Sequence, residues 1–308
     1  MARVLSTAVV LALLAATAAA FALTERAKLT LSPIYGTFVD PVFSPDGQAK
    51  PVAHIRFKVR TRERIDVWIQ SAKGERFTDL LSDRSVRPHQ EIDLVWDSFD
   101  EHGIAAPDGV YQPVVKLLQS HRTIVLPSDI RLDTQAPTIS VKHPQYPIIS
   151  PDGDGHADVF RIPYHLNEPA HAILLLRGTQ VVFTKSRKLT GELVFNGRDK
   201  HGNRLRPGRY LLSAAAQDTA GNRSKGKPFA IVQIRFVALG RDRVVVRPGG
   251  KFALRVSTDA PAVHWTLHGR SGTEPRGTLH FTAPKSPGVY RLYVTVGTHS
   301  AACAVVVA

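Results

Sequence analysis

The sequence predicts an all-β protein made of several β-sandwiches in tandem, and three observations lead to this prediction. A pattern that runs from Trp96 to Tyr111 returns 99 residues later, from Phe195 to Tyr210. Short stretches alternate between apolar and polar residues, as strands with one buried face do. The 21 prolines and 22 glycines interrupt these stretches, and no apolar stripe of helical period follows residue 30. A repeat of about one domain length in such a pattern indicates tandem sandwiches.

The chain opens with an uncharged apolar segment, Val4–Leu23, between Arg3 and the polar residues that follow. Such a segment is either a secretory signal peptide or a single membrane-spanning helix. Small residues near its end fit a cleavage site, so both interpretations stay open, and its length favours the anchor. In either case the remainder lies outside the cytoplasm. Residues 1–24 are therefore predicted to be an apolar targeting or anchor helix that attaches the protein to a membrane or directs its secretion.

Three sandwiches are expected after this helix, at residues 33–136, 137–237 and 240–308, with proline- or glycine-containing joints between them. Alternating residues predict which side chains face the cores. These residues are Ile55, Phe57 and Val59; Ile65, Val67 and Ile69; Phe160, Ile162, Tyr164 and Leu166; Tyr210, Leu212, Ala214 and Ala216; Phe252, Leu254 and Val256; Val263, Trp265 and Leu267; and Tyr290, Leu292, Val294 and Val296.

The repeated pattern reads as a strand end, a polar loop and a tight turn before the next strand. Short polar side chains there can accept hydrogen bonds from local backbone, glycine supplies positive φ, and the tyrosine packs into the core with its hydroxyl on a partner. The acidic residues are therefore interpreted as turn-forming rather than catalytic. The residues of this structural motif are Trp96, Asp100, Gly103, Gly109 and Tyr111 in the first copy, and Phe195, Asp199, Gly202, Gly208, Tyr210 and Asp218 in the second.

The first copy of the repeated pattern carries W-D-x-x-D-x-x-G with D-G-x-Y, and the second carries N-G-x-D-x-x-G with P-G-x-Y and D-T-A-G-N. The pattern resembles the Ig-like domain of the flagellar hook-capping protein family, the FlgD-type domain. That module also recurs in bacterial surface and secreted proteins. The resemblance covers about residues 40–236 and implies Ig-like sandwiches, without implying the hook-capping role. The first copy departs from it at Gln119–Arg122. The third segment lacks the loop, but Trp265 resembles the tryptophan of an Ig-like strand C, so a shorter, divergent Ig-like sandwich is expected.

Asp152, Asp154 and Asp158 are the strongest chemical signal. Carboxylates at these spacings, with glycines between them, can converge on one hard cation, and calcium accepts such oxygen-rich geometry. The spacing resembles the S-P-[DN]-G-D-G-x-x-D loops of bacterial surface modules and is no EF-hand, because Pro163 stands where the bidentate glutamate belongs. A glycine-rich turn with solvated carboxylates is the alternative. Calcium is therefore a candidate ligand of this loop.

The net charge of +14 is concentrated in the second and third modules. Residues 24–136 carry −1, residues 137–236 carry +8 and residues 237–308 carry +6. A partner of opposite charge is indicated: an anionic cell-wall polymer, lipid headgroups or envelope proteins. Nucleic acid is an unfavoured partner, since the sequence contains no recognition helix, aromatic RNA-binding motif or zinc finger.

No nucleophile–base arrangement, zinc spacing or nucleotide fingerprint is found in the sequence, and the single cysteine, Cys303, excludes an intramolecular disulfide. We therefore expect no enzyme activity. The expected function is that of an extracytoplasmic, envelope-attached scaffold or adhesion spacer. A binding module for acidic glycan or cell-wall polymer, and an accessory protein of a cell-surface enzyme system, are the alternatives.

Overall fold

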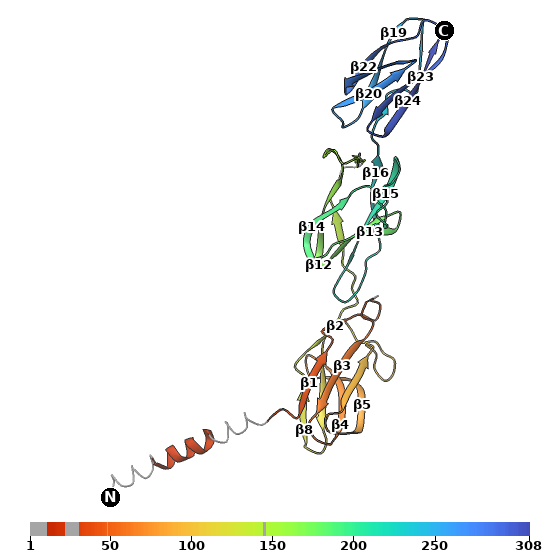
Figure 1. The fold of residues 1–308 in the computed structure, drawn as a ribbon. Helices are drawn as coiled ribbons and strands as arrows, with labels where there is room; N and C mark the ends of the chain where they lie inside the picture. The colour runs from red at the N-terminus through yellow and green to blue at the C-terminus, as the bar shows by residue number, and fades with distance from the viewer. Residues whose placement is uncertain (1–10, 22–30, 48, 144–145) are drawn as a thin grey trace. The chain divides into compact units, whose positions relative to one another are not determined.

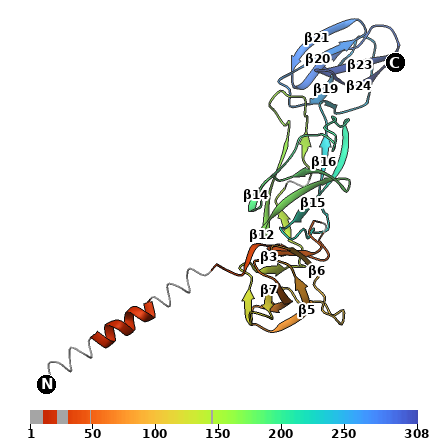
Figure 2. The ribbon, with the colours of Figure 1, turned by 60° about the horizontal axis from the view of Figure 1, so that its bottom comes forward.

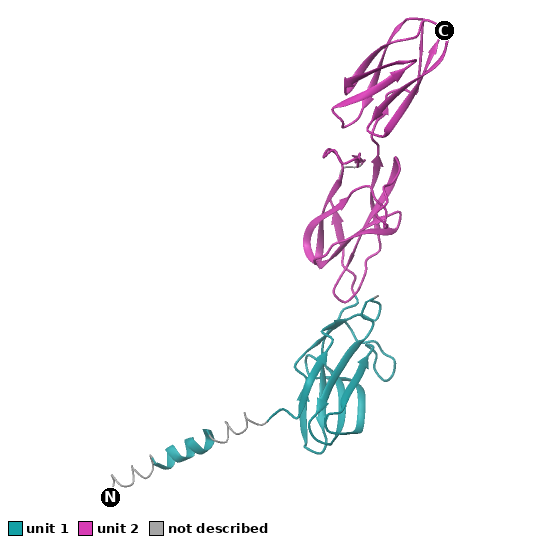
Figure 3. Ribbon diagram, in the orientation of Figure 1, with its two compact units in different colours: residues 1–134 teal, residues 135–308 magenta. Residues whose placement is uncertain are grey.

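The computed structural model describes residues 11–21, 31–47, 49–143 and 146–308 (Figure 1). The chain divides into two compact units, residues 1–134 and 135–308 (Figure 3). Beyond a helix over residues 11–21, the described residues form strands, turns and connecting segments. Among the described residues, the three largest hydrophobic cores lie between the sheets, one in unit 1 and two in unit 2. The prediction of an all-β fold with three tandem Ig-like sandwiches behind an N-terminal helix is confirmed.

The apolar N-terminal segment is only partly described. Residues 11–21 form a helix, whereas residues 1–10 and 22–30 lie outside the described residues. Within the part of the chain that the structure describes, no helix has the length and apolar character needed to span a membrane. The assignment of residues 1–24 as a signal peptide or anchor stays a prediction.

Unit 1 is one sandwich of two sheets. The smaller sheet has the strand order β1 (Ile34–Val39), β3 (Ala53–Val59) and β6 (Glu91–Trp96). The larger sheet has the order β2 (Val42–Phe43), β9 (Ile130–Leu132), β7 (Gly109–Leu117), β4 (Glu63–Ser71) and β5 (Arg76–Val86), with β8 (Arg122–Val125) paired to β7. Because alternate residues of β3 and β4 are buried, the core lies between the two sheets.

The first sandwich of unit 2 is held together by one long strand, β12 (Phe160–Leu176). Its first half pairs with β10 (Ile139–Val141) and β14 (Lys188–Phe195). Its second half pairs with β13 (Thr179–Phe183) and β15 (Gly208–Gln217), and the sheet continues through β16 (Lys227–Ile234) to β11 (Ile148–Ile149). The strand therefore contributes to both layers, where unit 1 uses the separate strands β3 and β4.

The second sandwich of unit 2 again has two sheets. One has the order β17 (Ala238–Leu239), β19 (Lys251–Ser257) and β22 (Gly277–Thr282). The other has the order β18 (Arg243–Val246), β24 (His299–Val307), β23 (Gly288–Val296), β20 (Ala262–Leu267) and β21 (Arg270–Pro275), and Figure 2 shows several of these strands together. Residues 238–239, which the sequence-based boundaries leave between two domains, thus belong to this sandwich as β17.

All three sandwiches close in the same way. In each, an early strand pairs in parallel with the last strand: β2 with β9, β11 with β16 and β18 with β24. The strand just before it pairs antiparallel into the opposite sheet, as β1, β10 and β17 do. The start of each module therefore contributes to both layers. The third sandwich shares this topology although its sequence lacks the repeated loop.

The alternating residues of the sequence are buried where alternation predicts. Ile55, Ile65 and Leu292 are fully buried, for example, while Phe252, Trp265 and Tyr290 are half-buried at the edge of the third core. Burial of these apolar side chains is the main source of stability, since the only cysteine, Cys303, is a buried thiol. The domain boundaries predicted at 136/137 and 237/240 stay predictions.

Candidate functional site

The first copy of the repeated motif is anchored by Trp96. Its side chain is 1% exposed and packs edge-on against Tyr111, with ring centroids 4.8 Å apart, and against Phe43 at 5.2 Å. Phe77 contacts both Trp96 and Tyr111. The strand end and the next strand's first aromatic residue are therefore joined in one aromatic cluster.

The loop after Trp96 is closed by Asp100. Its Oδ1 accepts hydrogen bonds from the backbone N–H of His102 at 2.9 Å and of Ile104 at 2.7 Å. Gly103, with φ of +76°, donates its N–H to the Asp100 carbonyl at 3.1 Å. The carboxylate therefore satisfies the backbone of its own turn, as Asx turns do.

The second copy repeats these bonds with its own residues. Asp199 Oδ1 accepts from the backbone N–H of His201 at 2.8 Å and of Asn203 at 2.9 Å, and Gly202 donates to the Asp199 carbonyl at 3.0 Å. Phe195, 1% exposed, takes the place of the tryptophan. Desolvation opposes the charge of Asp199, but the hydrogen bonds from Asn203 and His201 prevail and lower the pKa of its carboxyl group.

A tyrosine hydroxyl fastens the turn that follows in every sandwich. Tyr111 donates to the carbonyl of Pro107 at 2.7 Å, and Tyr210 donates to that of Arg206 at 2.8 Å. A Cβ added at the glycine two residues before each would lie in van der Waals contact with the ring, at 3.7 Å for Gly109 and 3.6 Å for Gly208. Tyr290 in the third sandwich makes the same bond, to the Ser286 carbonyl at 3.0 Å. The sequence analysis did not predict this third bond, although Pro287-Gly288-Val289-Tyr290 carries its pattern.

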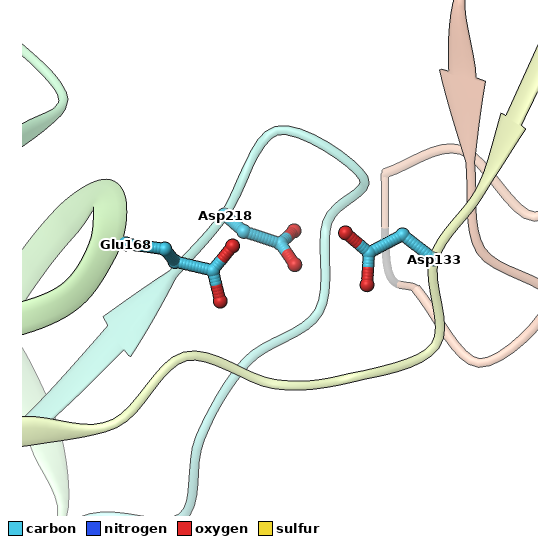
Figure 4. Close-up of side chains that lie close together, drawn as sticks. All are labelled: Asp133, Glu168 and Asp218. Carbon is cyan, nitrogen blue, oxygen red and sulfur yellow. The ribbon is translucent and has the colours of Figure 1, made fainter. Parts of the chain in front are cut away.

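Asp218 closes the last turn of the second copy. It is 6% exposed, and its Oδ1 accepts the backbone N–H of Gly221 at 2.8 Å and of Asn222 at 2.9 Å. Glu168, also in unit 2, has a carboxylate oxygen within 4.8 Å of one of Asp218 (Figure 4). Asp133, labelled in the same view, is a residue of unit 1.

The first copy uses a different acid for this turn. Glu63 of β4, 3% exposed, accepts the backbone N–H of Gln119 at 2.7 Å and the hydroxyl of Ser120 at 2.6 Å. The departure from the FlgD-type pattern at Gln119–Arg122 therefore coincides with a replacement carboxylate from another strand. Sequence reasoning missed Glu63, because the bond joins residues 56 positions apart.

The predicted calcium loop brings its three carboxylates together. Oxygens of Asp152, Asp154 and Asp158 lie within 4.8 Å of one another. The loop also satisfies them internally, since Asp158 accepts the backbone N–H of Gly153 at 2.7 Å and of Gly155 at 2.8 Å. The geometry is thus compatible with a hard cation and with a self-closed turn. Calcium binding stays a prediction.

Burial and neighbouring charges disfavour the ionised form of Asp152 in this loop. Burial raises the pKa of Asp152; a hydrogen bond from the Asp154 backbone N–H lowers it, and the charges of Asp154, Asp259 and Asp158 raise it. A divalent cation would relieve this repulsion, which is the electrostatic reason for testing the loop with calcium.

Trp265 holds the edge of the third sandwich. It faces Gly272 across the β20–β21 pair, and a Cβ at Gly272 would lie 2.9 Å from the indole ring. Phe281 packs edge-on against the indole, with centroids 5.2 Å apart.

Cys303 is 1% exposed, and burial, followed by the charge of Asp242, raises the pKa of its thiol. Trp265 and Cys303 are therefore placed as packing residues.

Sequence reasoning also missed a cleft in unit 2. It has a volume of about 590 Å³ and is lined by residues of both sandwiches of that unit, among them Arg235, Arg255 and Arg276. These arginines are about 20 residues apart in the sequence and show no local motif. Only the excess of basic residues after residue 136 signals a partner of negative charge.

The described residues thus define a class of protein: tandem Ig-like sandwiches with polar turns and one basic cleft. No family model matches the chain, and the search of curated proteins found no match. The fold is similar to solved structures of low sequence identity, and these similarities carry no argument about function.

Three of these structures illustrate the range. The fibronectin(III)-like modules of Clostridium thermocellum CbhA are 12% identical with a TM-score of 0.35, over 65% of this chain and 94% of that one. Sidekick-1 immunoglobulin domains 1–5 are 12% identical with a TM-score of 0.28, over 89% and 59%. A bacterial ice-binding adhesin of 1.5 MDa, studied for host cell surface retention, is 12% identical with a TM-score of 0.27, over 90% and 97%.

Proposed function

We propose that the chain is a non-catalytic modular protein outside the cytoplasm, attached to the cell envelope, whose sandwiches serve as a scaffold or adhesion spacer. The observation that carries this proposal is the internal use of the polar groups in the repeated loops. Asp100, Asp199 and Asp218 accept backbone N–H groups of their own turns. Groups used in this way are structural, and a fold of stacked sandwiches then supplies spacing and surface.

The first two sandwiches are, in this proposal, of the FlgD-type. The matching turns at Asp100 and Asp199 support this assignment, because the third segment lacks this loop in its sequence. The different anchors of the last turn, Asp218 in one copy and Glu63 in the other, are the point at which the two copies diverge.

Cell fractionation tests the proposed location. The full-length chain with a C-terminal tag is expressed in a bacterium, and we expect it in the envelope fraction, with the tag accessible to external protease once any outer barrier is opened. Deletion of residues 4–23 is the matched control and should leave the protein in the cytosol. Recovery of the intact chain from the cytosol would contradict the proposed location. The intact mass of the envelope form separates a cleaved signal peptide from a retained anchor.

Binding of an acidic glycan is a second candidate function. The observation that favours it is the basic charge of residues 137–308 together with the arginine-lined cleft in unit 2. Retention of the full chain on immobilised acidic polysaccharide should fall as salt rises, because salt screens exposed charges. Equal retention on a neutral polysaccharide would exclude this function.

A further inference from the structure

The cleft in unit 2 has the composition of an anion site. Its lining includes Arg235 after β16, Arg255 in β19 and Arg276 between β21 and β22, together with the hydroxyl-bearing Ser257 and Thr258. Its volume of about 590 Å³ falls within the range of small-ligand sites, about 300–1,000 Å³. Residues from both sandwiches are therefore needed to form it.

The side chains that line the cleft carry more positive than negative charge, while the acidic Asp152–Asp158 loop borders it at Ser150 and Ala157. Three arginines line it against one carboxylate, that of Asp259, whose Oδ2 accepts a hydrogen bond from the Ser150 hydroxyl. Arg276 Nη1 donates to the Asp259 backbone carbonyl at 2.9 Å, which orients its guanidinium. Among the described residues, the side chains of Arg235 and Arg255 make no hydrogen bond or ion pair. Their donors are available to a ligand.

The two sandwiches that form the cleft are joined by specific contacts. Besides the Ser150–Asp259 bond, the Thr258 hydroxyl donates to the carbonyl of Phe236 at 2.7 Å. The rings of Phe236 and His299 are stacked, with centroids 3.5 Å apart. A site fixed before binding loses less conformational entropy when a ligand arrives.

We propose that this cleft binds an anionic glycan, with the arginines on its carboxylate or phosphate groups and the Ser257 hydroxyl on a sugar hydroxyl. The planar fork of arginine matches both anions in a bidentate manner. No aromatic side chain is among the described residues that line the cleft, so bases have no stacking platform, and this disfavours single-stranded nucleic acid. The inference gives a site to the second proposed function and rests on it.

Titration of the full-length chain in neutral detergent tests the proposal. The probes are an oligogalacturonate for carboxylate, an oligo(glycerol phosphate) for phosphate, a neutral dextran of similar size and a single-stranded oligonucleotide. We expect one or both anionic glycan probes to bind and dextran to fail. The variant Arg235→Gln/Arg255→Gln/Arg276→Gln should bind at least about tenfold more weakly, because charge-assisted hydrogen bonds are lost.

A control with the same loss of charge separates the site from general attraction. Arg243, Arg247 and Arg291 are exposed residues of the third sandwich, which also carries Arg255 and Arg276, and they do not line the cleft. Their triple glutamine variant should bind within about twofold of the wild type, since screened, distant charges contribute little. Circular dichroism checks folding, and the single variant Arg255→Gln, at an exposed position, keeps the test valid if the triple variant is unstable.

The outcomes are distinct. Failure of the wild type to bind any anionic glycan probe would overturn the second proposed function together with the site. Glycan binding that both triple variants weaken equally would overturn the site alone. An oligonucleotide that binds more tightly than the glycan probes, and loses its affinity in the cleft variant, would overturn the ligand class.

Discussion

The loop after Trp96 and the loop after Phe195 make the same hydrogen bonds through a shared aspartate, histidine and glycine, while the residues around them differ. Asp100 and Asp199 each accept the backbone N–H groups two and four residues later. The anchors differ in size, and each fills a core of its own. The comparison teaches that the turn is defined by its carboxylate and its glycine, whereas the aromatic anchor adapts to the surrounding core.

One position separates the two loops in backbone strain. Ser98 has φ of +79°, which is unfavourable for a residue with a Cβ, and its buried hydroxyl lacks a hydrogen-bond partner among the described residues. Gly197 occupies the matching position with φ of +70°, and a Cβ there would lie 2.6 Å from the ring of Pro151. The second copy thus requires glycine, and the first copy tolerates serine at an energetic cost.

Of the changes that test this comparison, removal of the tryptophan anchor should lower the free energy of unfolding most. Trp96→Ala is expected to destabilise the first sandwich by about 3–5 kcal/mol, because it empties the centre of an aromatic cluster. Trp96→Phe, which imitates the second copy, should lose less than about 1.5 kcal/mol, since the indole N–H is buried and without a partner in the described structure. Calorimetry of the full chain measures both. If Trp96→Ala and Trp96→Phe lose the same stability, the first core does not accept a smaller aromatic anchor, and the comparison fails.

Exchange of residues at the strained position should move stability in opposite directions. Gly197→Ser should destabilise the second sandwich by about 2 kcal/mol or more, through a left-handed serine that also overlaps Pro151. Ser98→Gly should stabilise the first by about 1 kcal/mol. Calorimetry of the full chain resolves the two changes, because they fall on different sandwiches. A loss of stability in Ser98→Gly would contradict the strain argument.

Calcium should stabilise the second sandwich, through the Asp152–Asp158 loop, and leave the first unchanged. With a dissociation constant of about 1 mM, as extracellular modules show, 10 mM calcium stabilises the second sandwich by about 1.4 kcal/mol. Asp154→Asn should remove the effect. Asp46→Asn should leave it intact, because Ser44-Pro45-Asp46-Gly47 of the first copy matches Ser150-Pro151-Asp152-Gly153 but lacks the second and third carboxylates. Calorimetry with calcium, and with magnesium as the control ion, measures it. Unchanged melting in calcium would assign the loop to its self-closed state.

The smallest expected effect is the pH dependence that Asp199 gives to its turn. Its pKa is lowered in the folded state from an ordinary value of 3.8, so its contribution is present above that value. The contribution is lost as the pH falls through the lower folded-state pKa. Melting temperatures of wild type and Asp199→Asn should therefore differ at pH 6 and draw together as the pH falls below 3.8. A constant difference across this range would mean that charge has no role in closing the turn.

Much of this fold was predictable, because each sandwich is specified by local patterns. Alternation identified Ile55, Ile65 and Leu292 as core residues, and turn chemistry placed Asp100 and Asp199 in closed loops. Such patterns depend on residues a few positions apart, where geometry follows from backbone preference alone.

The unpredicted features depend on packing between distant segments. Glu63 reaches the turn at Gln119 because β4 and β7 are neighbours in one sheet. The cleft forms because Arg235 ends one sandwich while Arg255 and Arg276 lie in the next. No periodicity records such proximity, and an arginine in an isolated strand cannot be told from one exposed for solubility.

The parallel pairing of an early strand with the last strand determines how each sandwich responds to mechanical force. Tension applied to the two ends of a module acts along these strands, so their backbone hydrogen bonds are loaded in shear and break together rather than one by one. The β18–β24 pair aligns four residues on each strand, whereas β2–β9 and β11–β16 align two each. The third sandwich therefore has the parallel pair that resists force best. In a chain under tension, the first and second sandwiches should unfold before the third.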